Sequence, residues 1–294
     1  MTTKNIKPGL YIIATPIGNL GDITYRAIET LSASDIILCE DTRTSKKLLD
    51  AYNIKSKLES LHEFNERAKT DYVIEKLSEG KVISLISDAG TPLVSDPGFN
   101  LVKSCGQKGF YITTVPGACS AITALTLSSF PTNKFFFSGF LPVKTMARTK
   151  ILTNSKAIPS TLIFFETANR LEKCLIDVAK VFPESKVAVA KELTKIFESV
   201  VIDTAENLIE KIHTGQIVLK GEIVLLIDNS SADSLSQDAS YDEPDIDAKT
   251  IRKMAADLHK KDTLLTGRKI AKILSAQLQI HSSYIYKILN DNKK

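Results

Sequence analysis

The stretch SDAGTPLVSDPG, residues 87–98, decides the fold that we predict for this chain. It follows the apolar run 82–86 and precedes an apolar-periodic run over 99–105, which predicts a buried strand, a long loop and a helix. Its two glycines permit backbone angles closed to other residues, and Asp88 and Asp96 add two carboxylates. Open α/β sheets bind ligands at such a loop after a parallel strand, although this loop alone also fits a tight strand-to-helix connection.

The composition is that of a globular protein with room for two domains and a small third one. The chain has 294 residues, of which 43% are hydrophobic and 24% charged. No apolar run approaches the ~20 residues of a membrane helix, and the polar start leads straight into a strand. We therefore expect a cytoplasmic protein without a signal peptide or membrane contact. The four cysteines form no CxxC pair, which predicts reduced thiols and no bound metal.

A second loop of special composition is TPIGNLGD, residues 15–22, between a predicted strand over 10–14 and a predicted helix over 23–31. Asp22 is the predicted N-cap of that helix. The Gly-x-x-Gly spacing lacks the GxGxxG of dinucleotide sites, and the chain has no Gly-Lys-Ser/Thr phosphate loop. A nucleotide-binding α/β protein is therefore a weakened alternative.

A third loop, Glu40-Asp41-Thr42-Arg43, follows the next predicted strand and combines two acids, a hydroxyl and a guanidinium. Asp41 or Thr42 fits the N-cap of the helix over 45–51, with Arg43 paired to an acid. The same group fits substrate binding, and the two roles are compatible.

A fourth loop, PGACSA at 116–121, joins a predicted strand over 112–115 to a predicted helix over 122–128. Its small residues let a ligand approach the helix N-terminus, where free amides point outward, and equally permit close helix–sheet packing. Ser120 is the better binding candidate. We do not assign it as a nucleophile, because the G-x-S-x-G motif is missing.

The order of elements predicts two different sheets. Alternating strands and helices up to residue 130 indicate a mostly parallel, twisted sheet. Beyond it, short connections near 187–202 favour some antiparallel pairing and hence a mixed sheet. Strands of this second sheet are predicted over residues 135–140, 161–165, 187–190, 198–202 and 222–227.

The composition changes sharply after the second sheet. Residues 228–247 contain seven acids and no lysine or arginine, which is typical of a flexible linker. Residues 245–294 contain eleven lysines and arginines against five aspartates. Helical patterns over 251–258, 267–276 and 284–289 resemble a small helix-turn-helix module, which fits a nucleic-acid contact. A solubilising or dimer-packing helical cap is the alternative.

We therefore predict an α/β protein of two α/β domains, with a parallel-rich and then a mixed sheet, and a small C-terminal helical module. The predicted boundaries are 1–130 for the first domain, 131–228 for the second, 229–247 for the acidic linker and 248–294 for the basic module.

The four loops occur in this order with two further motifs, FFETANRL at 164–171 and KELTKIFE at 191–198. Together they resemble the ribosomal RNA small-subunit methyltransferase I family, within the tetrapyrrole (precorrin) methylase superfamily. The resemblance runs from about residue 10 to 228, and more loosely through the tail. One departure is Thr-Ala-Asn at 167–169, where the family pattern has Ser- or Ala-Pro followed by His or Thr.

The resemblance implies a homodimeric methylase that binds S-adenosylmethionine in a cleft between two domains and needs no metal. It also implies that the substrate is a cytidine 2′-hydroxyl of small-subunit (16S) ribosomal RNA at the decoding centre, in the 30S subunit. A methylase of a small tetrapyrrole or of a protein side chain, and a non-catalytic RNA-binding assembly factor, stay open as alternatives.

Candidate residues follow from the resemblance, motif by motif. We expect the cofactor at Asp88, Ala89, Gly90, Leu93, Val94, Ser120, Ala121, Phe165 and Ala190. A ribose hydroxyl is a poor nucleophile, so a base or an alkoxide-stabilising cation is needed; the candidates are Glu40, Asp41, Glu166, Lys191 and Glu192, with no single base assigned. Candidate substrate-binding residues are Pro16, Gly18, Asn19, Arg43 and Arg170.

Overall fold

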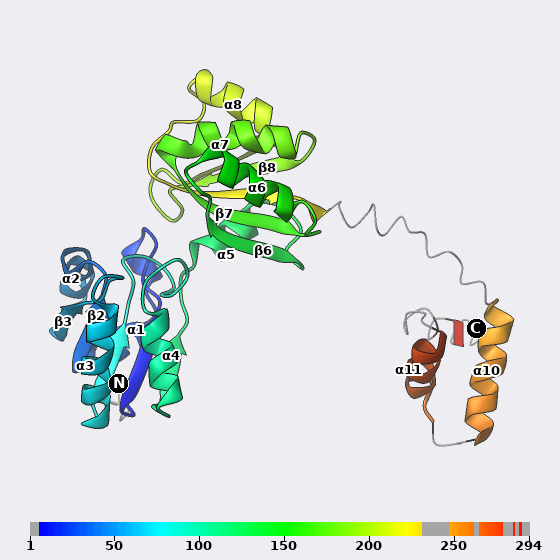
Figure 1. Ribbon diagram of the computed structural model, residues 1–294, viewed down its shortest axis with the longest axis horizontal. Coiled ribbons are helices and arrows are strands. Elements are labelled where there is room, and N and C mark those ends of the chain that lie inside the picture. Colours follow the sequence, from blue (N-terminus) through cyan, green and yellow to red (C-terminus); the bar gives the residue numbers. More distant parts are fainter. Residues whose placement is uncertain (1–5, 231–246, 262–264, 279–284, 286–287, 290–294) are drawn as a thin grey trace. The chain divides into compact units, whose positions relative to one another are not determined.

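A computed structural model describes residues 6–230, 247–261, 265–278, 285 and 288–289. Two compact units, residues 1–232 and 233–294, are each described by itself. The larger unit contains two five-stranded sheets (Figure 1). Most of the predicted acidic linker lies outside the described residues, as does most of the predicted helix over 284–289.

The first sheet is entirely parallel, which confirms the prediction of a mostly parallel sheet, and its strand order is β3-β2-β4-β1-β5. Every residue of β2 and β4 is buried, as expected for central parallel strands covered on both faces. Because the strands are parallel, the loops that follow them meet at one edge. The strands are β1 (Gly9–Ile13), β2 (Ile36–Cys39), β3 (Lys57–Ser60), β4 (Val82–Leu85) and β5 (Ile112–Val115).

Helices cover both faces of this sheet. The helices α1 (Tyr25–Ser32) and α2 (Thr42–Ala51) pack on one face through Leu31 and Leu49. The helices α3 (Glu66–Ser78) and α4 (Phe99–Gln107) pack on the other. Side chains alternate between the two faces along each strand, so neighbouring residues of one strand enter different cores.

Helix capping confirms one prediction and corrects another. The Asp41 carboxylate accepts a hydrogen bond from the Arg43 amide at 2.8 Å, so Asp41 caps α2. Asp22 does not cap α1, because it belongs to the short 3-10 turn η1 (Leu20–Asp22). Thr24 caps α1 instead, since its hydroxyl accepts from the Ala27 amide at 3.1 Å.

The second sheet is mixed, as predicted, with strand order β6-β7-β10-β8-β9. The strand β6 pairs parallel with β7, whereas β10 runs antiparallel to both β7 and β8, and β8 pairs antiparallel with β9. The strands are β6 (Phe135–Phe140), β7 (Thr161–Thr167), β8 (Lys186–Lys191), β9 (Ser199–Thr204) and β10 (Glu222–Asp228).

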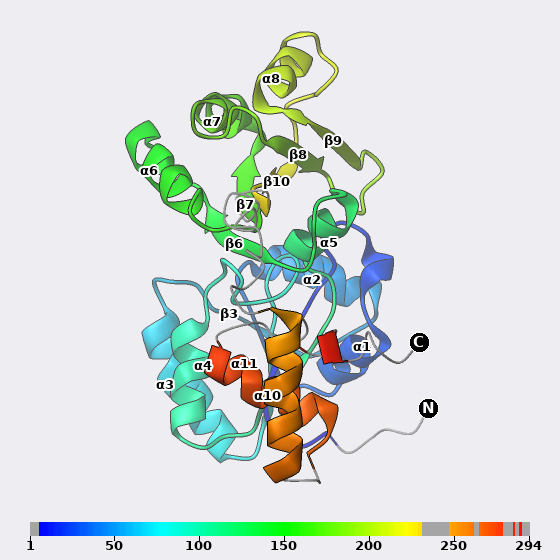
Figure 2. The same ribbon diagram turned by 90° about the vertical axis from the view of Figure 1, so that its right-hand side faces the viewer.

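Helices from two parts of the chain cover the two faces of the second sheet (Figure 2). On one face lie the helices α6 (Thr145–Ser155), α7 (Ala168–Val181) and α8 (Ala205–His213). On the other lies α5 (Ser120–Leu127), which follows β5 and packs against β7 and β10. Helix α5 therefore fixes the carboxyl edge of the first sheet beside the second sheet.

The smaller unit contains α10 (Ala248–Lys261) and α11 (Gly267–Leu278), which pack around a core of their own. Ile251, Leu274 and Ile285 are fully buried in that core. The Asp247 carboxylate accepts from the Thr250 amide at 2.6 Å at the start of α10. No helix within the described residues is long and apolar enough to cross a membrane.

Candidate functional site

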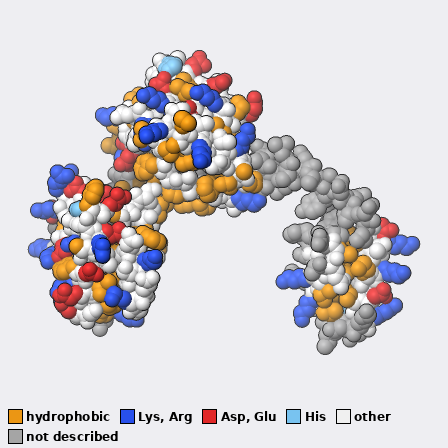
Figure 3. Space-filling view, viewed as in Figure 1, with side chains coloured by type: hydrophobic (Ala, Val, Ile, Leu, Met, Phe, Trp, Pro, Cys, Tyr) orange, Lys and Arg blue, Asp and Glu red, His pale blue; other side chains and the backbone are white. Residues whose placement is uncertain are grey.

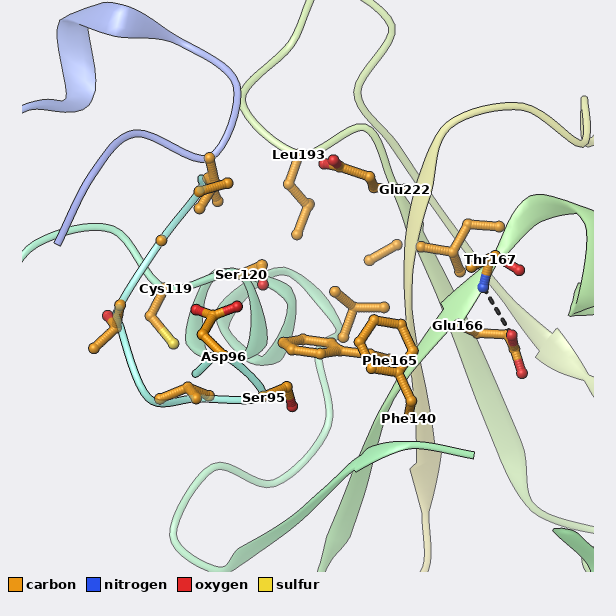
Figure 4. Close-up of a pocket in the computed structure, with 18 of the residues that line it drawn as sticks. Ser95, Asp96, Cys119, Ser120, Phe140, Phe165, Glu166, Thr167, Leu193 and Glu222 are labelled. Atoms are coloured by element: carbon orange, nitrogen blue, oxygen red, sulfur yellow. Dashed lines mark hydrogen bonds between the residues drawn. The ribbon is translucent and has the colours of Figure 1, made fainter. Parts of the chain in front are cut away.

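A cavity of about 300 Å³ lies where the carboxyl edge of the first sheet faces the second sheet (Figure 4). One side consists of the loop after β4 and the start of α5, and the other consists of residues of β6, β7, β8 and β10. The volume lies in the range of small-molecule sites. Side chains therefore leave an opening between the two sheets, as the methylase interpretation requires.

Hydrogen bonds connect the loops that form the first side. The Thr15 amide donates to the Gly90 carbonyl at 2.9 Å, and the Gly90 amide donates to the Thr15 carbonyl at 3.0 Å. The Thr91 hydroxyl donates to the Ala118 carbonyl at 3.1 Å. The Asp41 amide donates to the Asp88 carboxylate at 3.1 Å. Four loops that are distant in sequence thus form one connected edge.

Backbone strain concentrates at the same place. Among the described residues, six other than glycine have positive φ, and four of them lie in two loops beside the cavity. Leu93 (φ +74°) and Ser95 (φ +71°) belong to the loop after β4, and Glu192 (φ +49°) and Thr194 (φ +64°) follow β8. Such residues cost of order 1–3 kcal/mol each and cluster at functional sites.

Aromatic and small side chains form the wall of the second sheet. The Phe165 ring packs edge-on against Phe140, with 5.4 Å between centroids, and against Phe137, with 4.8 Å. Ala190 and Val224 complete an apolar surface between them and the loop after β8. This wall suits a flat or apolar part of a ligand.

Asp96 projects into the cavity from the opposite side (Figure 4). Burial raises the pKa of this carboxyl to about 6, and the neighbouring Glu40 and Asp88 add to the rise, whereas a hydrogen bond with Ser87 opposes it. We did not predict Asp96 as a site residue. The sequence could have indicated it, since Asp96 is the second carboxylate of the loop at 87–98.

Most of the residues predicted to bind the cofactor line this cavity. They are Asp88, Ala89, Gly90, Val94, Ser120, Phe165 and Ala190. Two predicted residues do not line it: Leu93 packs with the core beneath α3 and α4, and Ala121 packs between α5 and the second sheet. Thr91, Phe140, Leu193 and Glu222 line the cavity but were not predicted.

The predicted base Glu166 lines the cavity but is engaged in an ion pair. Its side chain is fully buried and lies 3.0 Å from Arg170 Nε, and it accepts from the Thr167 amide at 2.8 Å. Arg170 also donates to the Leu141 carbonyl. The structure therefore gives Arg170 a positioning role, and its contact with a substrate phosphate stays a prediction.

Of the predicted bases, Lys191 is the last residue of β8 and Glu192 is the first residue of the loop that follows. Lys191 Nζ donates to the Val218 carbonyl at 3.1 Å and does not line the cavity. Glu192 accepts from the Glu222 amide and from Lys195 Nζ, both at 3.0 Å, and these bonds lower the pKa of its carboxyl. Glu192 thus stabilises the loop after β8, and Lys191 stabilises the segment between α8 and β10.

Glu40 and Asp41 lie at the neighbouring loop after β2. Hydrogen bonds from the Arg43 side chain and amide lower the pKa of Asp41 to about 2. Burial and the nearby Asp88 raise the pKa of Glu40, which forms no ion pair among the described residues. Arg43 points outward, with a side chain that is 87% exposed.

The loop after β1 packs against the loop after β8. A Cβ on Gly18 would lie 2.5 Å from Lys195 Cγ, so only glycine fits this approach. Asn19 accepts from the Gly21 amide at 3.0 Å and forms a local turn, whereas Pro16 is half-buried. An open hollow of about 420 Å³ adjoins the cavity here and shares Ile17 and Cys119 with it.

The fold and the cavity define an α/β methylase with two sheets, and comparisons with known proteins agree. The family of tetrapyrrole (corrin/porphyrin) methylases matches residues 9–209. A solved cobalt precorrin-4 methyltransferase of cobalamin biosynthesis superposes with a TM-score of 0.56 at 19% identity, covering 74% of this chain and 93% of that one. A diphthine synthase superposes with a TM-score of 0.58 at 13% identity, covering 74% and 88%.

Sequence relatives are closer than these structures. Ribosomal RNA small subunit methyltransferase I of Rickettsia prowazekii is 49% identical over 222 residues, 76% of this chain and 79% of the relative. Its namesake in Escherichia coli O157:H7 is 40% identical over 272 residues, 90% of this chain and 95% of the relative. The chain therefore belongs to the ribosomal RNA small subunit methyltransferase I family of the tetrapyrrole methylases, and it is a methyltransferase.

Proposed function

We propose that this protein binds S-adenosylmethionine in the cavity and methylates the 2′-hydroxyl of a cytidine in small-subunit ribosomal RNA, at the decoding centre of the 30S subunit. The open cavity at the edge of the parallel sheet carries this proposal. The fold alone does not choose the substrate, because a precorrin methylase and a diphthine synthase have it too. The relatives at 40–49% identity favour ribosomal RNA.

The residues of the cavity fit the cofactor. Phe165 and Phe140 supply aromatic surface, Asp88 and Ser120 supply polar groups, and Ala190 leaves space beside them. The backbone of Ala89 and Gly90 lines the site, where a larger side chain at Gly90 would approach Ile17. The bound cofactor supplies an electrophilic methyl group on a sulfonium, and in-line attack by an acceptor requires mainly positioning.

The acceptor hydroxyl must lose a proton as the new bond forms, and the predicted candidates differ in availability. Glu166, Glu192 and Asp41 are held by cationic partners, and Lys191 by a carbonyl. Glu40 keeps a carboxylate with a raised pKa and no ion pair among the described residues. We therefore take Glu40 as the first candidate for the base.

RNA would reach the site along the hollow that adjoins the cavity, beside Pro16, Gly18 and Asn19. Arg43, in the loop after β2, is exposed and suits a backbone phosphate. The C-terminal unit adds exposed cations on a separately packed helical core, such as Lys249, Lys260 and Lys269. Such a module contributes affinity through phosphate contacts and loses it as salt increases.

We also propose that the protein forms a homodimer through the face around β6. Apolar side chains gather there (Figure 3). Phe135, Phe136 and Leu127 are 46%, 36% and 42% exposed, and Met146 is 88% exposed. Large exposed apolar patches mark interfaces. A monomer in sedimentation velocity, at concentrations where the protein is active, would contradict this.

One experiment tests the activity directly. Ribose methylation of small-subunit RNA is mapped in cells that lack the gene, and again after complementation with wild type or Asp88→Ala. We expect one 2′-O-methylcytidine to disappear and to return only with the wild type. Methylation of precorrin, but not of ribosomal RNA, by the purified protein would support a small-molecule methylase instead.

A further inference from the structure

The cavity carries uncompensated negative charge on one side. Asp88 and Asp96 line it, and Glu40 lies near enough to affect Asp96 electrostatically. Among the ion pairs of the described residues, none involves these three carboxylates. Glu40 and Asp88 are exposed, whereas Asp96 is half-buried. A half-buried carboxylate without a cationic partner is costly, so the position of Asp96 requires an explanation.

The opposite side of the cavity has a second feature that suits a cation. The rings of Phe140 and Phe165 extend from the second sheet toward the space that Asp96 faces (Figure 4). Phe140 is 54% exposed although its ring packs on Phe165, so part of its surface is free for a ligand. Aromatic faces attract cations, most strongly when the cation is removed from water.

We propose that Asp96, together with the rings of Phe140 and Phe165, selects the sulfonium form of the methyl donor over the neutral product. This inference rests on the proposed function. Methyl transfer forms a bond from the acceptor oxygen to the methyl carbon and breaks the carbon–sulfur bond, whose electron pair stays on sulfur. The acceptor proton passes to a base. The sulfonium thereby becomes a neutral thioether, and its attraction to Asp96 is lost.

The consequence is a site that holds the donor before the reaction and weakens its hold on the product afterwards. A sulfonium and a thioether have nearly the same shape, so packing alone discriminates poorly between them. Charge does discriminate, and its effect is greater in a half-buried cavity than in water. Asp96 is thus a specificity-determining residue of the donor site.

Calorimetric titration of the full-length protein at pH 8 tests this. The probes are S-adenosylmethionine, S-adenosylhomocysteine and sinefungin, an analogue whose ammonium-bearing carbon replaces the sulfonium. For Asp96→Asn we expect affinity for both cationic probes to fall about tenfold, the equivalent of one pK unit, while affinity for S-adenosylhomocysteine changes less than about twofold. The matched control is Asp71→Asn, an exposed acid on α3 that should change none of the three.

A second variant keeps the test decisive if Asp96→Asn folds poorly. Phe140→Leu preserves apolar bulk but removes the ring, and it should lower the ratio of sulfonium to thioether affinity about threefold. Equal losses for all three probes in both variants would overturn the inference and leave the proposed function intact. If the wild type bound neither S-adenosylmethionine nor S-adenosylhomocysteine, both would be overturned.

Discussion

Thr15 and Gly90 pair with each other through two backbone hydrogen bonds, of 2.9 and 3.0 Å, although 75 positions separate them in the chain. This bridge joins the loop after β1 to the loop after β4 beyond the ends of both strands. Gly90 adopts a φ of +82° to make it, and its neighbours Ala89 and Thr91 line the cavity. The geometry of this edge of the cavity therefore depends on a residue without a side chain.

A methyl group at Gly90 should damage the site more than the fold. In Gly90→Ala the new Cβ would lie 3.2 Å from Ile17 Cγ2, and Ile17 lines the cavity. We expect about 1–2 kcal/mol of lost stability from the left-handed backbone and at least about tenfold weaker S-adenosylmethionine binding. Urea denaturation and calorimetry measure the two effects.

Gly80 provides the matched control, because it has a φ of +78° and no atom lies within 4 Å of the position that a Cβ would occupy there. Gly80→Ala should lose a similar amount of stability and bind S-adenosylmethionine like the wild type. If the two variants lost cofactor affinity equally, strain alone would account for the effect, and the role that we give to the Thr15–Gly90 bridge would be wrong.

Asp96→Asn should stabilise the fold at neutral pH. The pKa of Asp96 is raised from 3.8 to about 6 in the folded protein, so ionisation costs more there than in the unfolded chain. This penalty is absent below pH 3.8, where both states are protonated, grows between pH 3.8 and about 6, and is complete above it. Allowing for solvent screening of a half-buried group, we expect a gain of about 1 kcal/mol at pH 7.5.

Urea denaturation at pH 7.5 and at pH 4 measures this gain, which should be present at the higher pH and nearly absent at the lower. A variant that is destabilised at both would show that the hydrogen bond with Ser87 matters more than the charge. A stabilised variant with weaker donor binding is the usual sign that a residue is retained for function at a cost in stability.

The sequence predicted the architecture because β1, β2 and β4 are short apolar runs, and the loops after β1, β4 and β5 contain glycine and proline. It predicted several residues that line the cavity for the same reason, since Asp88, Gly90 and Ser120 lie in or next to those loops. Phe140 could not be predicted from its own strand, because an aromatic residue there suits core or cavity equally. Its exposure depends on a parallel pairing with β7 whose register shifts between Phe137 and Phe140.

Two further features of the second domain were not predicted from the sequence. One, the helix α7, has a local pattern; the other, the burial of Arg148, depends on a residue distant in sequence. We predicted no helix at α7, although Leu171, Leu175 and Val178 recur at helical spacing on its buried face. Arg148 lies on α6, where the neighbouring Lys144 and Lys150 are basic and no acid is close in sequence. It is buried against Asp177, with Nη2 2.6 Å from Oδ2, and donates to the carbonyls of Pro142 and Val143. No local pattern reveals a partner 29 positions away.

Breaking this pair should be strongly destabilising. Both side chains are only 3% exposed, so Asp177→Asn would leave the Arg148 charge buried without its counter-ion. We expect a loss of about 3–5 kcal/mol in urea denaturation. Glu79→Gln, which breaks the exposed pair with Lys76, should cost less than about 1 kcal/mol. A loss of similar size in both variants would contradict the structural role of the buried pair.

Removal of residues 245–294 should separate RNA affinity from donor binding. The two sheets and the cavity belong wholly to the larger unit, so the truncated chain should bind S-adenosylmethionine within about twofold of the full chain. Its affinity for a small-subunit RNA fragment should fall, and so should the dependence of that affinity on salt, because each lost phosphate contact lowers the slope by about one. Gel-shift titrations at two or more salt concentrations measure both.

A matched full-length variant, Lys249→Gln with Lys253→Gln and Lys260→Gln, keeps the core of the helical module but removes three of its exposed cations. If this variant lost RNA affinity as the truncation does, the module would act through charge. If the truncation alone lost it, shape or packing would be responsible, and unchanged RNA binding in both would exclude the module from substrate recognition.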